Sequence, residues 1–206
     1  MAVTERREKR RLALRETILE AAQAIVRDDG LATLTIRKLA ERIDYSPAAL
    51  YAHFESREVL LAALCREGFA ALRVALETAA AANAEPRARL LALALAYVRC
   101  ALASPDTYRL IFMEDPVLTK GVFQTVETDD GARALALIVA PFAELRAAGT
   151  LRRSADPARL ADVLWVVVHG IASLRLSCPS LPATTDATVI ATALDALIDG
   201  WRPRSR

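Results

Sequence analysis

The chain has 206 residues, of which 54% are hydrophobic and 5% aromatic, and its formal net charge is only +2. This balance excludes a polycation, and the abundance of alanine and leucine with seven glycines favours helices over strands. The three cysteines (Cys65, Cys100 and Cys178) are too far apart in sequence for a disulfide framework or a metal site. We therefore expect no cofactor, cysteines packed in the core, and a reducing cytoplasmic compartment.

The first 15 residues carry the charge asymmetry of the chain. Six basic and two acidic side chains give this segment a net charge of +4, which leaves the rest of the chain near −2. A basic arm on a nearly neutral body is typical of a protein with one anionic partner at one end. A solvated, disordered tail is an equally good interpretation of the arm alone.

Hydrophobic periodicity predicts about nine helices and an all-α fold. In chain order they span about residues 12–29, 35–43, 47–54, 56–82, 86–103, 106–113, 121–148, 156–177 and 185–200. Gly30 is expected to close the first helix, and Pro141 to kink or split the seventh. The most apolar segment, 160–176, is interrupted by charged residues, and the charged N-terminus does not resemble a signal peptide, so we expect no membrane segment.

Residues 33–58 contain two short helices joined by a tight turn and preceded by a longer helix. This is the helix-turn-helix arrangement, in which the second short helix enters the major groove of DNA. The positions expected to face the core are Leu39, Ala40, Ile43, Leu50 and Phe54. The positions expected to be more exposed are Ser46, Pro47, Ala48, Ala49, Tyr51 and His53.

This segment resembles the TetR/AcrR family of transcriptional regulators across nearly all of residues 16–64. The resemblance is carried by Thr35, Ser46, the run Leu50-Tyr51-Ala52-His53-Phe54, and Arg57-Glu58. One departure is Asp44, which stands where the family usually has a turn glycine. Aspartate tolerates the left-handed conformation, so we expect the turn to survive with some strain.

The resemblance implies a DNA-binding domain with a basic arm at 1–63 and a ligand-binding and dimerisation domain at 64–206. It implies phosphate contacts from Thr35, Tyr51, His53 and Arg57. In isolation, Tyr51 and His53 would better suit packing against the fourth helix, and the surrounding motif favours phosphate contact instead. Additional charge is expected from Arg37 and Lys38, and either of these or Tyr45 is expected to reach base edges. The recognition helix itself offers Ser46, Pro47, Ala48 and Ala49, of which the two alanines suit thymine methyl groups. The arm is expected to lie along the DNA backbone or to reach the minor groove.

The last two long helices are predicted to form a homodimer. The eighth is apolar on every face, with a stripe of Leu160, Leu164, Val167, Ile171 and Leu174, and the ninth has Ile190, Leu194, Leu197 and Trp201 at similar spacing. A helix that is apolar all round must be buried on several sides, and a partner subunit is the simplest way to cover both helices. The eighth helix also resembles a TetR subgroup with a Trp…His-Gly motif, here Trp165, His169 and Gly170.

A small, largely apolar effector is expected to bind in the C-terminal domain and to release a repressor from its operator. Candidate lining residues are Tyr97, Cys100, Tyr108, Ile111, Phe112, Met113, Phe123, Trp165 and His169, which equally suit a plain core. An activator or a ligand-independent DNA-binding protein remains an alternative. An enzyme is not expected, because the sequence has no glycine-rich phosphate loop and no suggestive cluster of histidine with serine or cysteine.

Overall fold

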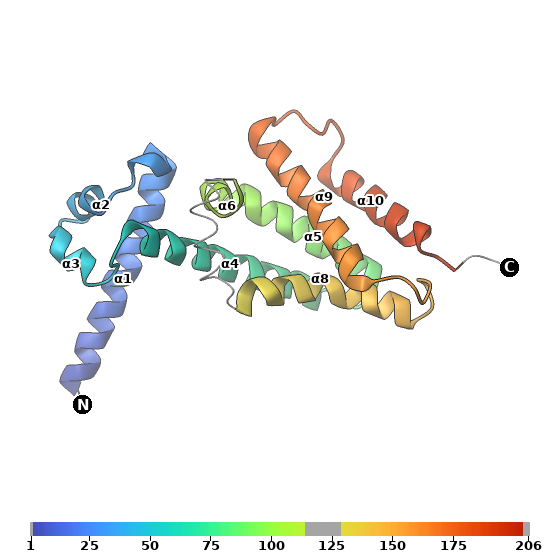
Figure 1. The fold of residues 1–206 in the computed structure, drawn as a ribbon, viewed down its shortest axis with the longest axis horizontal. Helices are drawn as coiled ribbons and strands as arrows, with labels where there is room; N and C mark the ends of the chain where they lie inside the picture. The colour runs from blue at the N-terminus through green and yellow to red at the C-terminus, as the bar shows by residue number, and fades with distance from the viewer. Residues whose placement is uncertain (1, 114–128, 204–206) are drawn as a thin grey trace. The chain divides into compact units, whose positions relative to one another are not determined.

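The computed structural model describes residues 2–113 and 129–203. These ranges form nine α-helices, one short 3-10 helix (η1) and no strand, which confirms the all-α class (Figure 1). The elements are α1 (Ala2–Asp29), η1 (Leu31–Thr33), α2 (Ile36–Arg42), α3 (Pro47–Tyr51), α4 (Arg57–Ala81), α5 (Pro86–Ala103), α6 (Pro105–Phe112), α8 (Asp129–Ala147), α9 (Pro157–Ser177) and α10 (Asp186–Gly200). The helix predicted from residue 121 is thus described only from Asp129 onward.

The helices pack as two units. The first contains Met1–Gly68 and the described part of the segment that begins at Asp106, and the second contains Phe69–Pro105 and the helices from α8 onward. Helix α4 belongs to both, because the division between the units falls inside it. The domain boundary that we predict after residue 63 also lies within this helix.

The first unit is built around α1, whose inner face buries Ile18, Leu19, Ala22 and Ile25. This helix begins at Ala2, about ten residues earlier than its apolar periodicity indicates. The extension has no apolar face, but its arginines and glutamates are good helix formers. One pair three residues apart, Glu8 and Arg11, joins across a turn with N–O distances of 2.9 and 3.0 Å. The basic arm is therefore helical.

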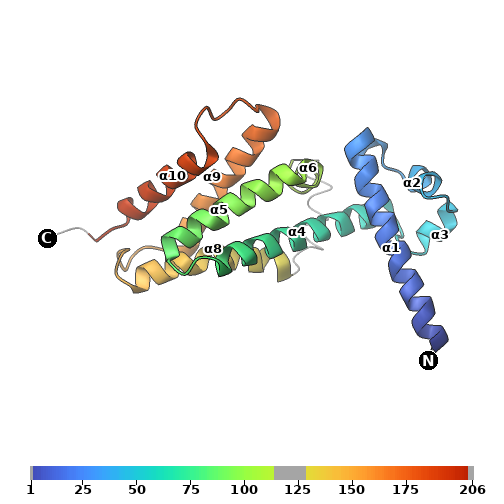
Figure 2. The same ribbon diagram turned by 180° about the vertical axis from the view of Figure 1, so that it is seen from behind.

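The second unit is a bundle in which α5, α8, α9 and α10 lie side by side (Figure 2). Pro141 lies inside α8 without splitting it, so of the two expected outcomes only a kink remains a prediction. The hydrogen bond that proline cannot donate is offset by burial of apolar neighbours on the same helix, including Ile138 and Phe142. Gly149, with φ 76°, ends the helix, and the Thr150 amide donates to the Leu145 carbonyl at 3.0 Å.

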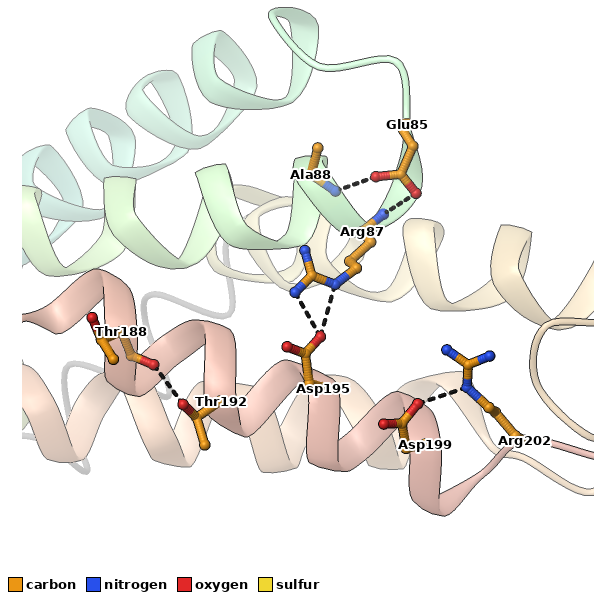
Figure 3. Close-up of polar contacts among 8 residues, drawn as sticks. All are labelled: Glu85, Arg87, Ala88, Thr188, Thr192, Asp195, Asp199 and Arg202. Atoms are coloured by element: carbon orange, nitrogen blue, oxygen red, sulfur yellow. Dashed lines mark hydrogen bonds and ion pairs between the residues drawn. The ribbon is translucent and has the colours of Figure 1, made fainter.

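Helices α5 and α10 are also joined by polar contacts (Figure 3). The Glu85 carboxylate caps α5 by accepting from the amides of Arg87 at 2.9 Å and Ala88 at 2.6 Å. The Arg87 guanidinium reaches across to Asp195 of α10, with its Nη2 2.6 Å from Oδ1. Both partners of this ion pair are about half exposed, so the pair orients the helices more than it stabilises them.

The apolar stripes of α9 and α10 are mostly buried within the chain itself. Leu160 and Leu164 of α9, and Ile190 and Leu194 of α10, have at most 2% of their surface exposed. The expectation that a partner subunit buries these particular residues is therefore wrong, because α5, α9 and α10 already cover them. By length and composition alone, α9 could cross a membrane, as could the bent pair of α5 and α6 if the two formed one span; among the described residues, α9 packs against α5, α8 and α10.

Candidate nucleic-acid interface

The two short helices of the first unit are fixed by their own caps. The Thr35 hydroxyl accepts from the Lys38 amide at 3.1 Å at the start of α2, and the Ser46 hydroxyl accepts from the Ala49 amide at 3.2 Å at the start of α3. Pro47 occupies the first turn of α3 as predicted. These local bonds satisfy backbone donors at each helix start, so they fix the residue at which each short helix begins.

The turn between them is formed by Asp44. Its φ of 57° makes it the only non-glycine residue with positive φ in the described chain, which confirms the predicted left-handed conformation. The following amide, of Tyr45, donates to the Ala40 carbonyl at 3.0 Å, the longer bond of a Schellman motif, and thereby closes α2. Aspartate therefore performs the structural role that glycine performs at the end of α8.

The helix-turn-helix presents one buried and one exposed side. Leu39, Ala40, Leu50 and Phe54 are at most 1% exposed, as predicted, whereas Ile43 is only partly buried. The other side is built from small or hydroxyl-bearing residues. Its members are Tyr45, Ser46, Pro47, Ala48 and Tyr51, which are exposed, and Ala49, which is partly buried. The start of α3 is thus accessible to a partner, while its end is anchored in the core.

The cations of α2 are held by carboxylates. Lys38 Nζ lies 3.0 Å from Asp29 Oδ2, and Arg37 Nε lies 3.1 Å from Glu41 Oε1. Arg42, which our sequence analysis does not single out, has its Nη2 2.6 Å from Asp28 Oδ2. Any phosphate that binds Arg37 or Lys38 must compete with these exposed and therefore weak ion pairs.

Arg57, at the start of α4, points back into the protein. Its Nε donates to the Leu34 carbonyl at 2.8 Å, and its Nη2 donates to the Leu31 carbonyl at 3.0 Å. The guanidinium therefore ties α4 to the segment that leads into Thr35 and α2. Only the structure reveals this role, because backbone acceptors 23 and 26 residues away leave no pattern in the sequence.

His53 follows α3 and lies within electrostatic reach of α1. Its ring is partly buried, and its Nδ1 has no hydrogen-bond partner among the described residues. Burial, followed by the positive charges of Arg11 and Arg15, lowers the pKa of His53. The Arg15 guanidinium also lies over the Phe54 ring, 4.7 Å from its centroid. Helix α1 therefore brings two cations to the end of α3.

In the second unit, three of the predicted effector residues meet. The Trp165 indole donates to the Tyr97 hydroxyl at 3.3 Å, and the same hydroxyl lies 3.3 Å from His169 Nδ1. Trp165 and His169 share a helix face, as predicted, with ring centroids 6.0 Å apart. Burial lowers the pKa of His169, which favours the neutral form of its ring.

The remaining effector candidates are more scattered. Tyr108 and Phe112 form a ring pair in the first unit with centroids 5.1 Å apart, whereas Cys100 belongs to the second unit. Met113 is exposed, and Phe123 lies outside the described residues. Within the part of the chain that the structure describes, no three His, Cys, Asp or Glu side chains are placed to hold a metal ion.

Comparisons with known proteins agree with this geometry. Residues 18–64 match the bacterial regulatory proteins of the tetR family, and residues 90–199 match the tetracyclin repressor-like C-terminal domain. The HTH-type transcriptional regulator BetI of Rhizobium meliloti is 26% identical over 181 residues, covering 86% of this chain and 85% of BetI.

Solved structures show the same fold along the chain. A protein of unknown function from Rhodococcus sp. RHA1 is 33% identical with a TM-score of 0.77, covering 92% of this chain and 96% of that one. Thermus thermophilus FadR, a TetR-family repressor solved with lauroyl-CoA, is 21% identical with a TM-score of 0.65, covering 93% and 97%. Family matches at both ends and full-length structural likeness lead to one conclusion: this chain belongs to the TetR family of transcriptional regulators.

Proposed function

We propose that this protein is a cytoplasmic, dimeric repressor that binds a specific operator and leaves it when a small, largely apolar effector binds. The observation that carries the proposal is the exposed start of α3. Ser46, Pro47 and Ala48 are accessible there, while Leu50 and Phe54 hold the helix from behind. A helix presented in this way fits the major groove.

Base recognition would rest on short side chains. Ala48 and Ala49 offer methyl groups that suit the methyl group of thymine, and Ser46 offers one hydroxyl. None of these makes a bidentate contact with a purine. Tyr45 in the turn and Arg37 on α2 are exposed, and they are the proposed sources of longer polar contacts.

Phosphate contacts would flank the groove. Thr35, Tyr51 and His53 lie at the ends of α2 and α3, and Tyr51 is 52% exposed, which favours contact over packing. Lys38 is the proposed cation beside them. For Arg57 we propose a positioning role, because its guanidinium already bonds the carbonyl of the residue before Thr35.

A second copy of the chain would cover the exposed faces of α9 and α10 in a homodimer. The outward face of α9 leaves Val163 42%, Val166 66% and Leu174 42% exposed. TetR-family regulators form dimers, and burying these side chains against a second copy would remove the apolar surface from water. Two recognition helices then read half-sites about 34 Å apart or somewhat more.

The effector would bind near the cluster of Tyr97, Trp165 and His169. This cluster provides a hydroxyl and an imidazole among apolar side chains, which suits an apolar ligand with one polar group. The other proposed lining residues are Cys100, Tyr108, Phe112, Met113 and Phe123. FadR of the same fold binds lauroyl-CoA, so an elongated apolar molecule is a reasonable first probe.

Release would require that the effector changes the position of the reading helices. Helix α4 runs through both units, and at Gly68 it lies against α6. A Cβ on Gly68 would lie 2.6 Å from Thr107 Cγ2 and 2.8 Å from Ile111 Cδ1, so the two helices are in close contact, and a shift of α6 would be passed to α4. The effector must bind the DNA-free state more tightly for this to release the operator.

The test is selection of bound duplexes from a random pool, followed by affinity measurements with and without lauroyl-CoA, with free coenzyme A as control. We expect one enriched, roughly palindromic sequence whose affinity falls when the effector is present. An effector that strengthens binding would favour the activator alternative, and the absence of any enriched sequence would contradict the proposal.

A further inference from the structure

The N-terminal helix carries a feature that the helix-turn-helix does not explain. We propose that residues 4–15 of α1 form a rigid phosphate-binding ridge, with Arg7, Arg11 and Arg15 gripping the DNA backbone outside the helix-turn-helix. The inference rests on the proposed function, because it assumes that α3 enters the same duplex.

The ridge has a defined shape because the arm is helical. Helix α1 begins at Ala2, and the side chains of residues 4–13 are exposed. The ten residues before Leu12 span about 15 Å at the rise of an α-helix. Figure 1 shows this half of α1 extending beyond α2 and α3, the helices of its own unit.

The spacing of the three arginines places them on one face. Positions four residues apart are neighbours on a helix surface, so Arg7, Arg11 and Arg15 follow one another along the same side. This side of α1 faces the end of the helix-turn-helix, because the Arg15 guanidinium lies 4.7 Å from the centroid of the Phe54 ring. The positive charges of Arg11 and Arg15 both lower the pKa of His53, which follows α3. The ridge therefore begins beside the recognition helix and continues away from it.

The arm also carries the least compensated charge of the first unit. Residues 4–15 have a net charge of +4, and Arg7 has no ion pair among the described residues. Arg11 pairs with Glu8 within the arm. On α2 each of the three cations, Arg37, Lys38 and Arg42, faces a carboxylate, whereas the arm keeps a net positive charge after its two glutamates are counted. A polyanion near the helix-turn-helix would find its strongest uncompensated attraction at the arm.

The arm is expected either to lie along the DNA backbone or to reach the minor groove, and the width of the groove favours the backbone. An α-helix with side chains is about 10–12 Å wide, whereas the minor groove of B-DNA is about 6 Å wide. A helical arm cannot enter that groove without unwinding. The phosphate backbone beside the half-site is then its partner, and each phosphate contact should contribute about 0.9 to the salt dependence of binding.

The experiment compares two variants of equal charge in the full-length protein. R7Q/R11Q removes two ridge arginines, and the control R6Q/K9Q removes two cations from the opposite face of the same helix. Glutamine is nearly as good a helix former as arginine and lysine, so both variants should keep the arm helical. A third variant, R7K/R11K, keeps the charge of the ridge. Each is titrated onto the duplex that the wild type selects, at several salt concentrations.

We expect R7Q/R11Q to lower the slope of log affinity against log salt by about 3.6 for a dimer, which loses four contacts. The wild-type affinity would then fall roughly 150-fold further than that of the variant between about 50 and 200 mM salt. R6Q/K9Q should change the slope by less than half as much, and R7K/R11K should restore it. Hydroxyl-radical protection should shorten by about four base pairs at each end in R7Q/R11Q.

Equal salt slopes for R7Q/R11Q and R6Q/K9Q, or a hydroxyl-radical footprint of unchanged length, would contradict the proposal that the ridge binds phosphates. These results leave the helix-turn-helix proposal intact, since the wild type still selects and binds its duplex. A wild type that selects no duplex would instead contradict the proposed function itself, so the two failures are distinguishable.

Discussion

The two packing units differ in how far a single chain buries their apolar side chains. In the first, Leu50 and Phe54 of the helix-turn-helix are at most 1% exposed, and the outward start of α3 carries the small side chains of Ser46, Pro47 and Ala48. In the second, α9 buries Leu160 and Leu164 but leaves Val166 66% exposed. The helix-turn-helix therefore combines a buried core with a proposed binding face of small side chains, whereas α9 still exposes apolar side chains that suit a protein partner.

The units also differ in how their shapes are fixed. The helix-turn-helix depends on backbone bonds made by nearby residues, such as the caps at Thr35 and Ser46. The second unit depends on side chains that meet over long sequence distances, as Tyr97 and His169 do across 72 residues. Substitutions should therefore act through backbone geometry in the first unit and through association or packing in the second.

The largest effect is expected at the exposed face of α9. Val166→Glu would place a charge in the proposed dimer interface, and we expect it to weaken dimerisation by at least about 100-fold, or roughly 3 kcal/mol. Val74→Glu is the matched control, because it makes the same substitution at an exposed position of α4, outside the proposed interface. Sedimentation velocity measures both. Equal dimerisation of the two variants would contradict the proposal that the exposed face of α9 binds a second copy.

A smaller effect is expected at the start of α4. Arg57→Ala would leave the carbonyls of Leu31 and Leu34 without their donor, and we expect a loss of about 2 kcal/mol in the free energy of unfolding. Arg37→Ala, at a side chain that is 85% exposed, should change stability by less than about 0.5 kcal/mol. Urea denaturation compares them, and similar losses would argue against a positioning role for Arg57.

The turn residue should have a still smaller effect, of opposite sign. Asp44→Gly relieves the cost of φ 57° but adds freedom to the unfolded chain, so we expect stability to stay level or rise by up to about 1 kcal/mol. Gly149→Ala, at the equivalent turn of α8 with φ 76°, should be destabilising. A clear fall in Tm for Asp44→Gly would show that the aspartate side chain itself stabilises the turn.

The two histidines predict a gradual dependence of stability on pH. Burial lowers the pKa of both His53 and His169, so below the unfolded value of about 6.5 the unfolded state binds more protons. Stability should therefore fall as the pH drops from about 7 to about 5.5, and His53→Gln and His169→Gln should each remove part of that fall. Urea titrations at several pH values measure it, and stability that increases on acidification would contradict the assignment.

Local features were predictable because their causes are local. The caps at Thr35 and Ser46, Pro47 in the first turn, and the left-handed Asp44 are each set by neighbours within a few residues. The buried side of the helix-turn-helix follows from helical periodicity for the same reason. Such features need no knowledge of which segments meet in space.

Features that depend on distant partners were missed. Periodicity shows that Ile190 and Leu194 are buried, but it does not say whether α5 and α9 or a second subunit covers them. The bonds from Arg57 to two carbonyls have no sequence pattern at all. The helical arm was missed because a charged helix has no apolar stripe, although arginines at 7, 11 and 15 carry the spacing of one.

The central claim is that α3 lies in the major groove twice per complex, once from each subunit. Selection of duplexes with Ala48→Gln measures this most directly, because Ala48 is exposed and glutamine can pair with adenine. We predict that the variant selects a sequence altered at two symmetrically placed positions and unchanged elsewhere. An unaltered sequence, or a change at one position without its symmetric partner, would contradict the claim.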